Sequence, residues 1–406
     1  MADTEENPKA APEAAPSEPT AVSQPSAAGA DAASAAPAAP AAAPAVSASS
    51  PPAAPSSPAA AVSPKSATSS AAGRTSASPR AASSSPAAAA AVEASADAPI
   101  DAEEAFDDND SALGDSGVVD YPVEYGRRYH AYQHGRYSRP NDELEMDRLL
   151  IMHTVITLAT GSLFRAPVNM DEPQQILDIG TGNGVWAIEM ADQYPNATII
   201  GNDLSANMPT FVPPNVKFEV DDVENEWVYE QPFTFIFSRY MAASIGDWPK
   251  LVQNAYNNLA PGGWAEFQDF DLTYYSEDGS LKADNPLMVW INTMCNASRN
   301  MGRDPCPGSK LEGWFRDAGF TNIVHKRYRL PLGPWPRDPH LKEIGLHNYM
   351  QVNQGLEGLS LRLFMNVLKW KLEETMVMLA EVRKSLHDPN IHTILDYHVV
   401  YGQRPE

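Results

Sequence analysis

The chain is poor in cysteine and in basic residues, and both shortages exclude classes of protein. Its only cysteines are Cys295 and Cys306, which form no C-x-x-C pair and have no His/Cys cluster of zinc spacing around them. Lys and Arg number 29 against 52 Asp and Glu, giving a net charge of −23. Direct nucleic-acid binding is therefore not expected, because a phosphate backbone favours Lys and Arg.

Long apolar runs are also absent. No segment is long and apolar enough to span a bilayer, and the first residues, MADTEE, lack the basic and apolar regions of a secretory signal. We therefore expect no transmembrane segment. Because no His/Cys cluster is present, we also expect no metal site. A reducing, intracellular compartment is expected, the nucleus and/or the cytoplasm.

The first hundred residues lack aromatic side chains, the first of which is Phe106. They consist mostly of Ala, Ser and Pro, and 16 of the 36 prolines precede Asp101. Nothing there could offset the entropy cost of ordering the chain. We predict that residues 1–117 form a disordered acidic tail and that 118–406 form one folded domain.

A glycine-rich turn is the most informative feature of the folded part. Residues 175–179 (QILDI) form a predicted buried strand, and 185–194 have the apolar spacing of a helix. Between them, Gly180, Gly182 and Gly184 allow sharp turns and let a ligand lie against the backbone. The pattern predicts a ligand at a helix N-terminus, where N–H groups are free.

An acidic residue, Asp203, ends the next predicted strand, 198–203. A carboxylate at this place can accept hydrogen bonds from both hydroxyls of a ribose, so a nucleoside cofactor is the first inference. A dinucleotide would favour G-x-G-x-x-G, but Val185 holds the position of its third glycine, and Asp178 precedes the first. The D-x-G-x-G-x-G pattern resembles motif I of class I methyltransferases, which bind S-adenosylmethionine (SAM). A dehydrogenase is the weakest alternative.

Further elements alternate between strand and helix, as in a parallel sheet covered on both faces. Strands are predicted at 215–222, 232–239 and 264–269, with a helix at 248–259. Later elements are helices at 286–300 and 309–318, a strand at 321–330, a long helical stretch at 341–387 and a strand at 396–401. Class I methyltransferases end in an antiparallel hairpin, which a helical insertion at 340–390 would split here. That insertion is interpreted as packed on the core; the alternative is a lid over the acceptor pocket or a groove for a partner.

A narrower resemblance is carried by the segments YPVEYGRRYHAY (121–132) and PNDELEMDRL (140–149). They resemble the opening of the fungal LaeA-like (TAM-domain) methyltransferases. The resemblance continues through 212–218, 221–227 (DDVENEW), 244–248 and 261–264. It implies a Rossmann-like class I methyltransferase with a mostly parallel seven-stranded sheet and SAM as cofactor. Family members include methyltransferases attached to velvet regulators, which influence development and secondary metabolism, and others that look like tailoring enzymes.

The expected cofactor-binding residues follow the ends of the predicted strands. They are Tyr132, Asp178, Gly180, Thr181, Gly182, Gly184, Asp203, Leu204, Asp222, Val223, Ser238 and Arg239. Asp178 and the glycines would hold the methionine part of SAM, Asp203 the ribose, Asp222 with Val223 the adenine, and Ser238 with Arg239 the floor near the methyl group.

The region 118–165 is expected to be a helical lid segment. Four arginines lie there among tyrosines: Arg127, Arg128, Arg136 and Arg139. They predict either a cofactor lid or partner surface with aromatic faces, or a packed helix whose arginines pair with Glu143, Glu145 and Asp147.

Methyl transfer mainly requires that the reacting groups be aligned, with a base if the acceptor is a hydroxyl. The sequence assigns no catalytic residue; candidate bases are His325, His347 (weakly favoured), His392, His398, Glu266, Asp269 and Tyr349. The hypothesis is a SAM-dependent methyltransferase with an unidentified acceptor, acting in the regulation of fungal development and secondary metabolism. One alternative is a tailoring O- or N-methyltransferase. The other is a SAM-binding regulatory scaffold that works mainly by protein–protein interaction, with a velvet-type protein or a chromatin factor as its partner.

Overall fold

The computed structural model describes residues 121–130 and 137–406. The predictions for the tail 1–117 and for Tyr132 and Arg136 lie outside these residues. The elements are β1 Val123–Glu124, β2 Arg127–Arg128, α1 Glu143–Thr160, β3 Gln175–Ile179, α2 Val185–Gln193, β4 Thr198–Asp203, β5 Val216–Val220, β6 Phe233–Arg239, α3 Trp248–Asn258, β7 Leu259–Tyr275, α4 Pro286–Asn300, a 3₁₀ turn Gly308–Lys310, α5 Leu311–Ala318, β8 Thr321–Leu332, α6 Pro339–Arg362, a π turn Leu363–Val367, α7 Leu372–His387 and β9 Thr393–Gln403.

The seven long strands form one sheet in the order β5-β4-β3-β6-β7-β9-β8. The first five pair in parallel, and β9 lies antiparallel between β7 and β8. The predicted mostly parallel, seven-stranded sheet is confirmed. The chain builds outward from β3 to β5 and then returns to β6 on the other side of β3. This reversal opens a crevice at the carboxyl ends of β3 and β6.

Two helical layers cover the sheet because its central strands are apolar on both faces. Ile176 of β3 packs with the α2 side, where Trp186 stacks on Phe237 of β6 at 3.9 Å and an interplanar angle of 1°. The next residue, Leu177, packs with α3 and α5 on the opposite face. A third core joins α1, α4, α6 and α7 to the distal parts of β7, β8 and β9.

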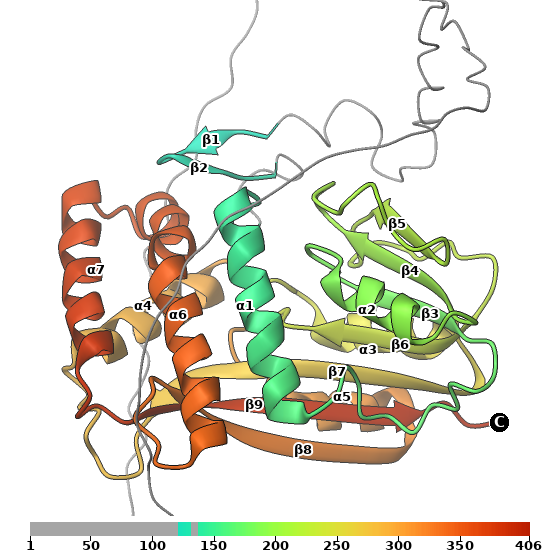
Figure 1. Ribbon diagram of the computed structural model, residues 1–406. Helices are drawn as coiled ribbons and strands as arrows, with labels where there is room; N and C mark the ends of the chain where they lie inside the picture. The colour runs from blue at the N-terminus through green and yellow to red at the C-terminus, as the bar shows by residue number, and fades with distance from the viewer. Residues whose placement is uncertain (1–120, 131–136) are drawn as a thin grey trace, which may run out of the picture. The chain divides into compact units, whose positions relative to one another are not determined.

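The insertion before the last strand consists of two helices, α6 and α7, beside α1 and α4 (Figure 1). The long helix expected at 341–387 is therefore interrupted. The π turn ends at Val367, and Lys369 takes a left-handed φ of 62°. Phe364 and Trp370 pack at a centroid distance of 5.0 Å across this break. The break reverses the chain so that the apolar side of α7, with Leu379 and Val382, returns to the core.

The region 118–165, expected to be helical, begins instead with a hairpin. β1 and β2 are joined at Tyr125 and Gly126, whose φ values of 55° and 78° suit a tight two-residue turn. The helix α1 begins only at Glu143. Arg127 forms a bidentate ion pair with Asp142, the N-cap of α1, at 2.6 and 2.7 Å. Arg127 and Arg128 thus secure the hairpin to the helix start, and Arg128 pairs with an expected partner, Glu143, at 3.1 Å.

Across the part of the chain that the structure describes, no helix has the length and apolar character needed to cross a membrane.

Two glycines permit a matched test of packing at the glycine turn. Gly161 and Gly184 have similar φ values, 75° and 74°. A Cβ at Gly161 would meet open space, whereas one at Gly184 would overlap the Phe218 ring. We expect Gly161→Ala to destabilise the fold by about 1–2 kcal/mol from backbone strain alone. Gly184→Ala should cost about 1–3 kcal/mol more from overpacking. Urea unfolding of both variants measures the difference, and equal losses would contradict the packing argument.

Candidate functional site

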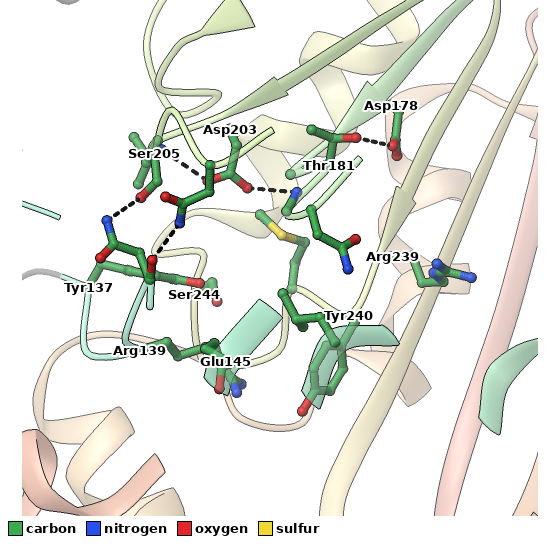
Figure 2. A pocket seen from close by; sticks show the side chains of 18 of the residues that line it. Tyr137, Arg139, Glu145, Asp178, Thr181, Asp203, Ser205, Arg239, Tyr240 and Ser244 are labelled. Atoms are coloured by element: carbon green, nitrogen blue, oxygen red, sulfur yellow. Dashed lines mark hydrogen bonds between the residues drawn. The ribbon is translucent and has the colours of Figure 1, made fainter. Parts of the chain in front are cut away.

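A cavity lies at the carboxyl ends of β3, β4, β5 and β6, with α1 and the segment before it forming the opposite wall (Figure 2). Nine of the twelve expected residues line it: Asp178, Gly180, Thr181, Gly182, Asp203, Leu204, Asp222, Val223 and Arg239. Ser238 and Gly184 do not line it, and Tyr132 lies outside the described residues. Carboxylates from three different strand ends thus meet in one cleft.

Asp178 ends up buried at the turn between β3 and α2, with 3% of its surface exposed. Its carboxylate accepts a hydrogen bond of 2.6 Å from the Thr181 hydroxyl. Burial raises the pKa of Asp178 to about 7, although the Thr181 hydrogen bond and the positive charge of Arg239 act in the opposite direction. A cation placed beside this carboxylate would restore its ionised form.

Asp203 connects the end of β4 to the glycine turn. Its two oxygens accept hydrogen bonds of 3.0 Å from the backbone N–H groups of Gly182 and Ser205. Burial raises the pKa of Asp203, and these backbone hydrogen bonds partly offset the effect. Figure 2 shows the Asp203 side chain beside the cavity, on the opposite side from Arg239. The carboxylate therefore shapes the turn, and Asp203 also lines the cavity.

Asp222 and Val223 follow β5 and form the adjoining wall. Asp222 accepts a hydrogen bond of 3.0 Å from the Glu224 N–H, and Val223 is buried against the core around α3. Glu224 in turn forms an ion pair with Arg303 and accepts a hydrogen bond from the Gly246 N–H at 2.8 Å. This wall is therefore connected to two loops far away in sequence, and Arg303 itself lines the cavity.

Arg239 projects from the end of β6 toward α1. Its Nη2 donates to His153 Nδ1 at 2.8 Å, and His153 Nε2 lies 3.1 Å from a Glu189 oxygen. Burial and the nearby Arg239 lower the pKa of His153 to about 3, so the ring is neutral and its proton sits on Nε2, facing Glu189. Arg239 Nη1 is buried and has no hydrogen-bond partner among the described residues.

Ser238 differs from its neighbour Arg239 because it pairs with both adjoining strands, whereas Arg239 pairs only with Gln268 of β7. Ser238 lies in register with Ile179 and Phe267 and is 2% exposed. Successive strand residues point to opposite faces. The expectation that Ser238 lines the floor is therefore not met, whereas Arg239 does line the cavity.

A lid segment was expected at 118–165, but the residues of α1 that line the cavity were not named from the sequence. Glu145, Met146, Leu149, Met152 and His153 line the cavity from this helix, and Tyr137 and Arg139 line it from the preceding segment. The buried residues of α1 include the polar side chains of Glu145, Arg148 and His153.

None of the seven candidate bases lines the cavity. The Glu266 carboxylate accepts the N–H groups of Arg165 and Ala166, and Asp269 accepts those of Met241 and Ala242. These two acids hold loops in place. His347 lies on α6 with Nδ1 3.0 Å from the Glu343 carbonyl. Four further candidates are not among the residues that line the cavity either: His325, His392, His398 and Tyr349.

The cleft has the chemistry of a SAM site. SAM carries an ammonium, a sulfonium, a carboxylate and a ribose diol, and the cavity is lined by acidic side chains, by Arg239 and by side-chain-free backbone at Gly180 and Gly182. A Cβ at Gly180 would overlap the Met241 side chain. Together with the sheet order, this site defines a class I SAM-dependent methyltransferase.

Comparisons with known proteins agree. A family described as a methyltransferase domain matches residues 154–325. Methyltransferase pytC of Aspergillus terreus is 42% identical over 310 residues, 75% of this chain and 95% of that protein. The secondary metabolism regulator LAE1 of Cochliobolus heterostrophus is 35% identical over 291 residues, 70% and 95% of the two chains. The chain belongs to the LaeA-like family of SAM-dependent methyltransferases, and SAM is its cofactor.

Two further proteins illustrate the range of similarity. The protein-methionine methyltransferase laeA of Emericella nidulans is 33% identical over 287 residues, 70% of this chain and 76% of that protein. Among solved structures, phosphoethanolamine N-methyltransferase 2 of Haemonchus contortus in complex with SAM is 19% identical. It is similar over 64% of this chain and 53% of that one, with a TM-score of 0.37.

The raised pKa of Asp178 predicts a pH dependence of cofactor binding. In the free protein this carboxyl titrates at about 7. A bound ammonium favours the ionised form, so binding releases a proton below that pH. SAM affinity should therefore rise from about pH 5.5 to about pH 7, by at most about tenfold per pH unit, and then level off.

Calorimetric titration across this range measures the effect, and Asp178→Asn is its control. The variant should bind SAM more weakly at pH 7 and lose the slope. Equal slopes in both proteins would show that another group is responsible.

Proposed function

We propose that this methyltransferase acts in the regulation of fungal development and secondary metabolism, on an acceptor that reaches the cofactor cavity from the side of α1. The methyltransferase chemistry is supported by the convergence of Asp178, Asp203 and Asp222 with Arg239 around a single cleft, and the regulatory role by similarity to LAE1 and laeA. Because these groups come from different strands, the sheet holds a ligand at several points. Such a cleft can fix the orientation of a cationic nucleoside.

In this proposal each part of the cofactor has a protein partner. Asp178 would receive the ammonium, Arg239 Nη1 the carboxylate, Asp203 the ribose hydroxyls, and Asp222 with Val223 the adenine. Bound SAM supplies an electrophilic methyl group on its sulfonium. The protein contributes alignment and exclusion of water, and alignment can supply up to about 7–11 kcal/mol of the barrier in favourable cases. The side chains of Met146, Leu149 and Met152 provide the apolar wall.

The biological role has three candidate interpretations. Similarity to regulators named LAE1 and laeA supports a regulatory role in the nucleus and/or cytoplasm, with a velvet-type protein as partner. The relative named protein-methionine methyltransferase makes a protein side chain one acceptor class. A tailoring enzyme for a small secondary metabolite is the second candidate, favoured by an apolar cavity beside the cofactor site. A scaffold that binds SAM but works by protein contacts is the third.

A substitution at Gly182 tests cofactor binding and the need for it. Gly182 has a φ of 61°, and a Cβ there would come within 3.3 Å of Leu149. Gly182→Glu would also place a second carboxylate beside Asp203. We expect SAM affinity to fall at least about 100-fold, or about 2.7 kcal/mol, as measured by calorimetry.

Gly161→Ala, remote from the cleft, is the matched control, and circular dichroism shows whether each variant is folded. Heat with NAD but none with SAM in the unmodified protein would overturn the cofactor assignment. If folded Gly182→Glu still restores metabolite production in a deletion strain, the scaffold reading replaces the catalytic one.

A further inference from the structure

The only two cysteines of the chain lie close together, although they are 11 positions apart in sequence. Cys295 is on α4, and Cys306 is in the loop before the 3₁₀ turn. The Cys295 thiol donates to the Leu272 carbonyl of β7 at 3.2 Å, and the Cys306 sulfur lies 3.5 Å from the hydroxyl of the next residue, Thr273. The Cys306 sulfur is a second acceptor within reach of the Cys295 thiol. Both thiols are free.

The two thiols differ in exposure and in acidity. Cys295 is 4% exposed, whereas Cys306 is half-buried and its sulfur accepts a hydrogen bond from Arg299 Nη2 at 3.9 Å. The hydrogen bond from Cys295 lowers the pKa of Cys306, against the opposing effect of burial. The same bond, together with burial, raises the pKa of Cys295. Because the thiolate is the reactive form of cysteine, Cys306 is the nucleophile of the pair and Cys295 its protonated partner.

The segment between the cysteines borders the cofactor cavity. Arg303 lines that cavity and forms an ion pair with Glu224, which also lines it. The Asp304 carbonyl accepts the N–H of Ala243 at 2.8 Å. Ala243 belongs to the loop after β6, where it and Tyr240 adopt φ values of 62° and 63°, which are unusual for residues other than glycine. Such a strained loop keeps its shape only while neighbouring contacts hold it, and the Asp304 contact is one of them.

We propose that Cys295 and Cys306 are an oxidation-sensitive thiol pair, which a hydroperoxide converts into a disulfide that weakens SAM binding. A disulfide holds its sulfur atoms about 2.05 Å apart, much closer than two unbonded sulfur atoms can approach. Closing that gap moves the loop that carries Cys306 relative to α4. Arg303 and Asp304 lie within the ring so closed, and their contacts with the cavity walls, which form in the reduced protein, are therefore disturbed. The inference depends on SAM as cofactor and is independent of which acceptor is methylated.

The oxidation balances with one hydroperoxide for each pair of thiols. The Cys306 thiolate attacks one peroxide oxygen, the oxygen–oxygen bond breaks, and the leaving oxygen takes up the proton that Cys306 had lost. Cys306 is then a sulfenic acid. The Cys295 sulfur attacks the Cys306 sulfur, the sulfur–oxygen bond breaks, and the Cys295 proton leaves with the hydroxide as water. The two thiols lose two electrons in total, and the hydroperoxide is reduced to an alcohol or water.

Hydrogen peroxide added to the reduced full chain tests the pair, and tryptic peptide mapping without reductant detects the product. Trypsin cuts after Arg299 and Arg303, so the two cysteine peptides stay together only if a disulfide joins them. We expect the joined peptides from a chain that runs as a monomer on a non-reducing gel, and dithiothreitol should separate them. Loss of the free thiols without this link, or a link only between two chains, overturns the proposal.

Single substitutions assign the two roles. Cys295→Ala should keep a reactive Cys306, which dimedone traps as a sulfenic acid. Cys306→Ser should leave Cys295 unmodified under the same peroxide dose, because that thiol is buried and protonated. Oxidation of Cys295 in this variant as fast as in the unmodified chain contradicts the assigned order and overturns the proposal. Circular dichroism checks that each variant is folded, and mapping of the unmodified chain tests the link without any variant.

Calorimetric titration with SAM measures the effect on the cofactor cavity. The disulfide-linked chain should bind SAM at least about fivefold more weakly than the reduced chain, and dithiothreitol should restore the affinity. Peroxide also oxidises methionine, so Cys306→Ser treated in the same way is the control and should keep its SAM affinity. Equal affinities of the reduced and disulfide-linked chains overturn the proposal, and so does an equal loss in the control.

Discussion

The buried ion pair between Glu145 and Arg148 is the contact on which the arrangement of the site depends. Arg148 is fully buried and Glu145 is 2% exposed, and the pair continues to Tyr240 and to Gln351 of α6 at 2.8 Å. Burial alone would lower the pKa of Arg148, but Glu145 and Tyr240 more than offset this and raise it. Breaking such a pair typically costs about 3–5 kcal/mol, since one charge is left buried and unpaired. The pair therefore connects α1, the loop after β6 and the inserted helix α6.

This network also explains how one fold can hold two kinds of surface side by side. On the strand side, the side chains of Asp178, Asp203, Asp222 and Arg239 line the cofactor cleft. On the helical side, rings and aliphatic side chains face a second, apolar cavity. Tyr240 lines both. Arg148 donates to its hydroxyl, and the Asp269 carboxylate accepts the N–H groups of the next two residues, Met241 and Ala242, which holds the strained backbone in place. The polar cofactor cleft and the apolar second cavity can therefore adjoin each other at Tyr240.

Sequence patterns predicted the sheet well because they are local there. The bounds expected for β3 and β4 are those observed, and α4 also agrees, since strand alternation and helical spacing are set by neighbouring residues. The prediction that the N-terminal segment is helical was wrong at the β1–β2 hairpin, and Gly184 proved to serve packing against Phe218 instead of lining the cavity. Those outcomes depend on contacts with distant residues, which no local pattern contains.

By itself the sequence determined the class of fold, the glycine turn and the acids at the strand ends, because each is a property of a short segment and its position along the chain. Only the tertiary structure decided that α1 forms the far wall, that Arg239 is left with a free Nη1, and that a ring-lined cavity lies behind Tyr240. These features need side chains from α1, β6, β7, α4, α6 and β9 to meet in space. Whether these side chains meet depends on packing between residues far apart in the sequence, which no single segment determines.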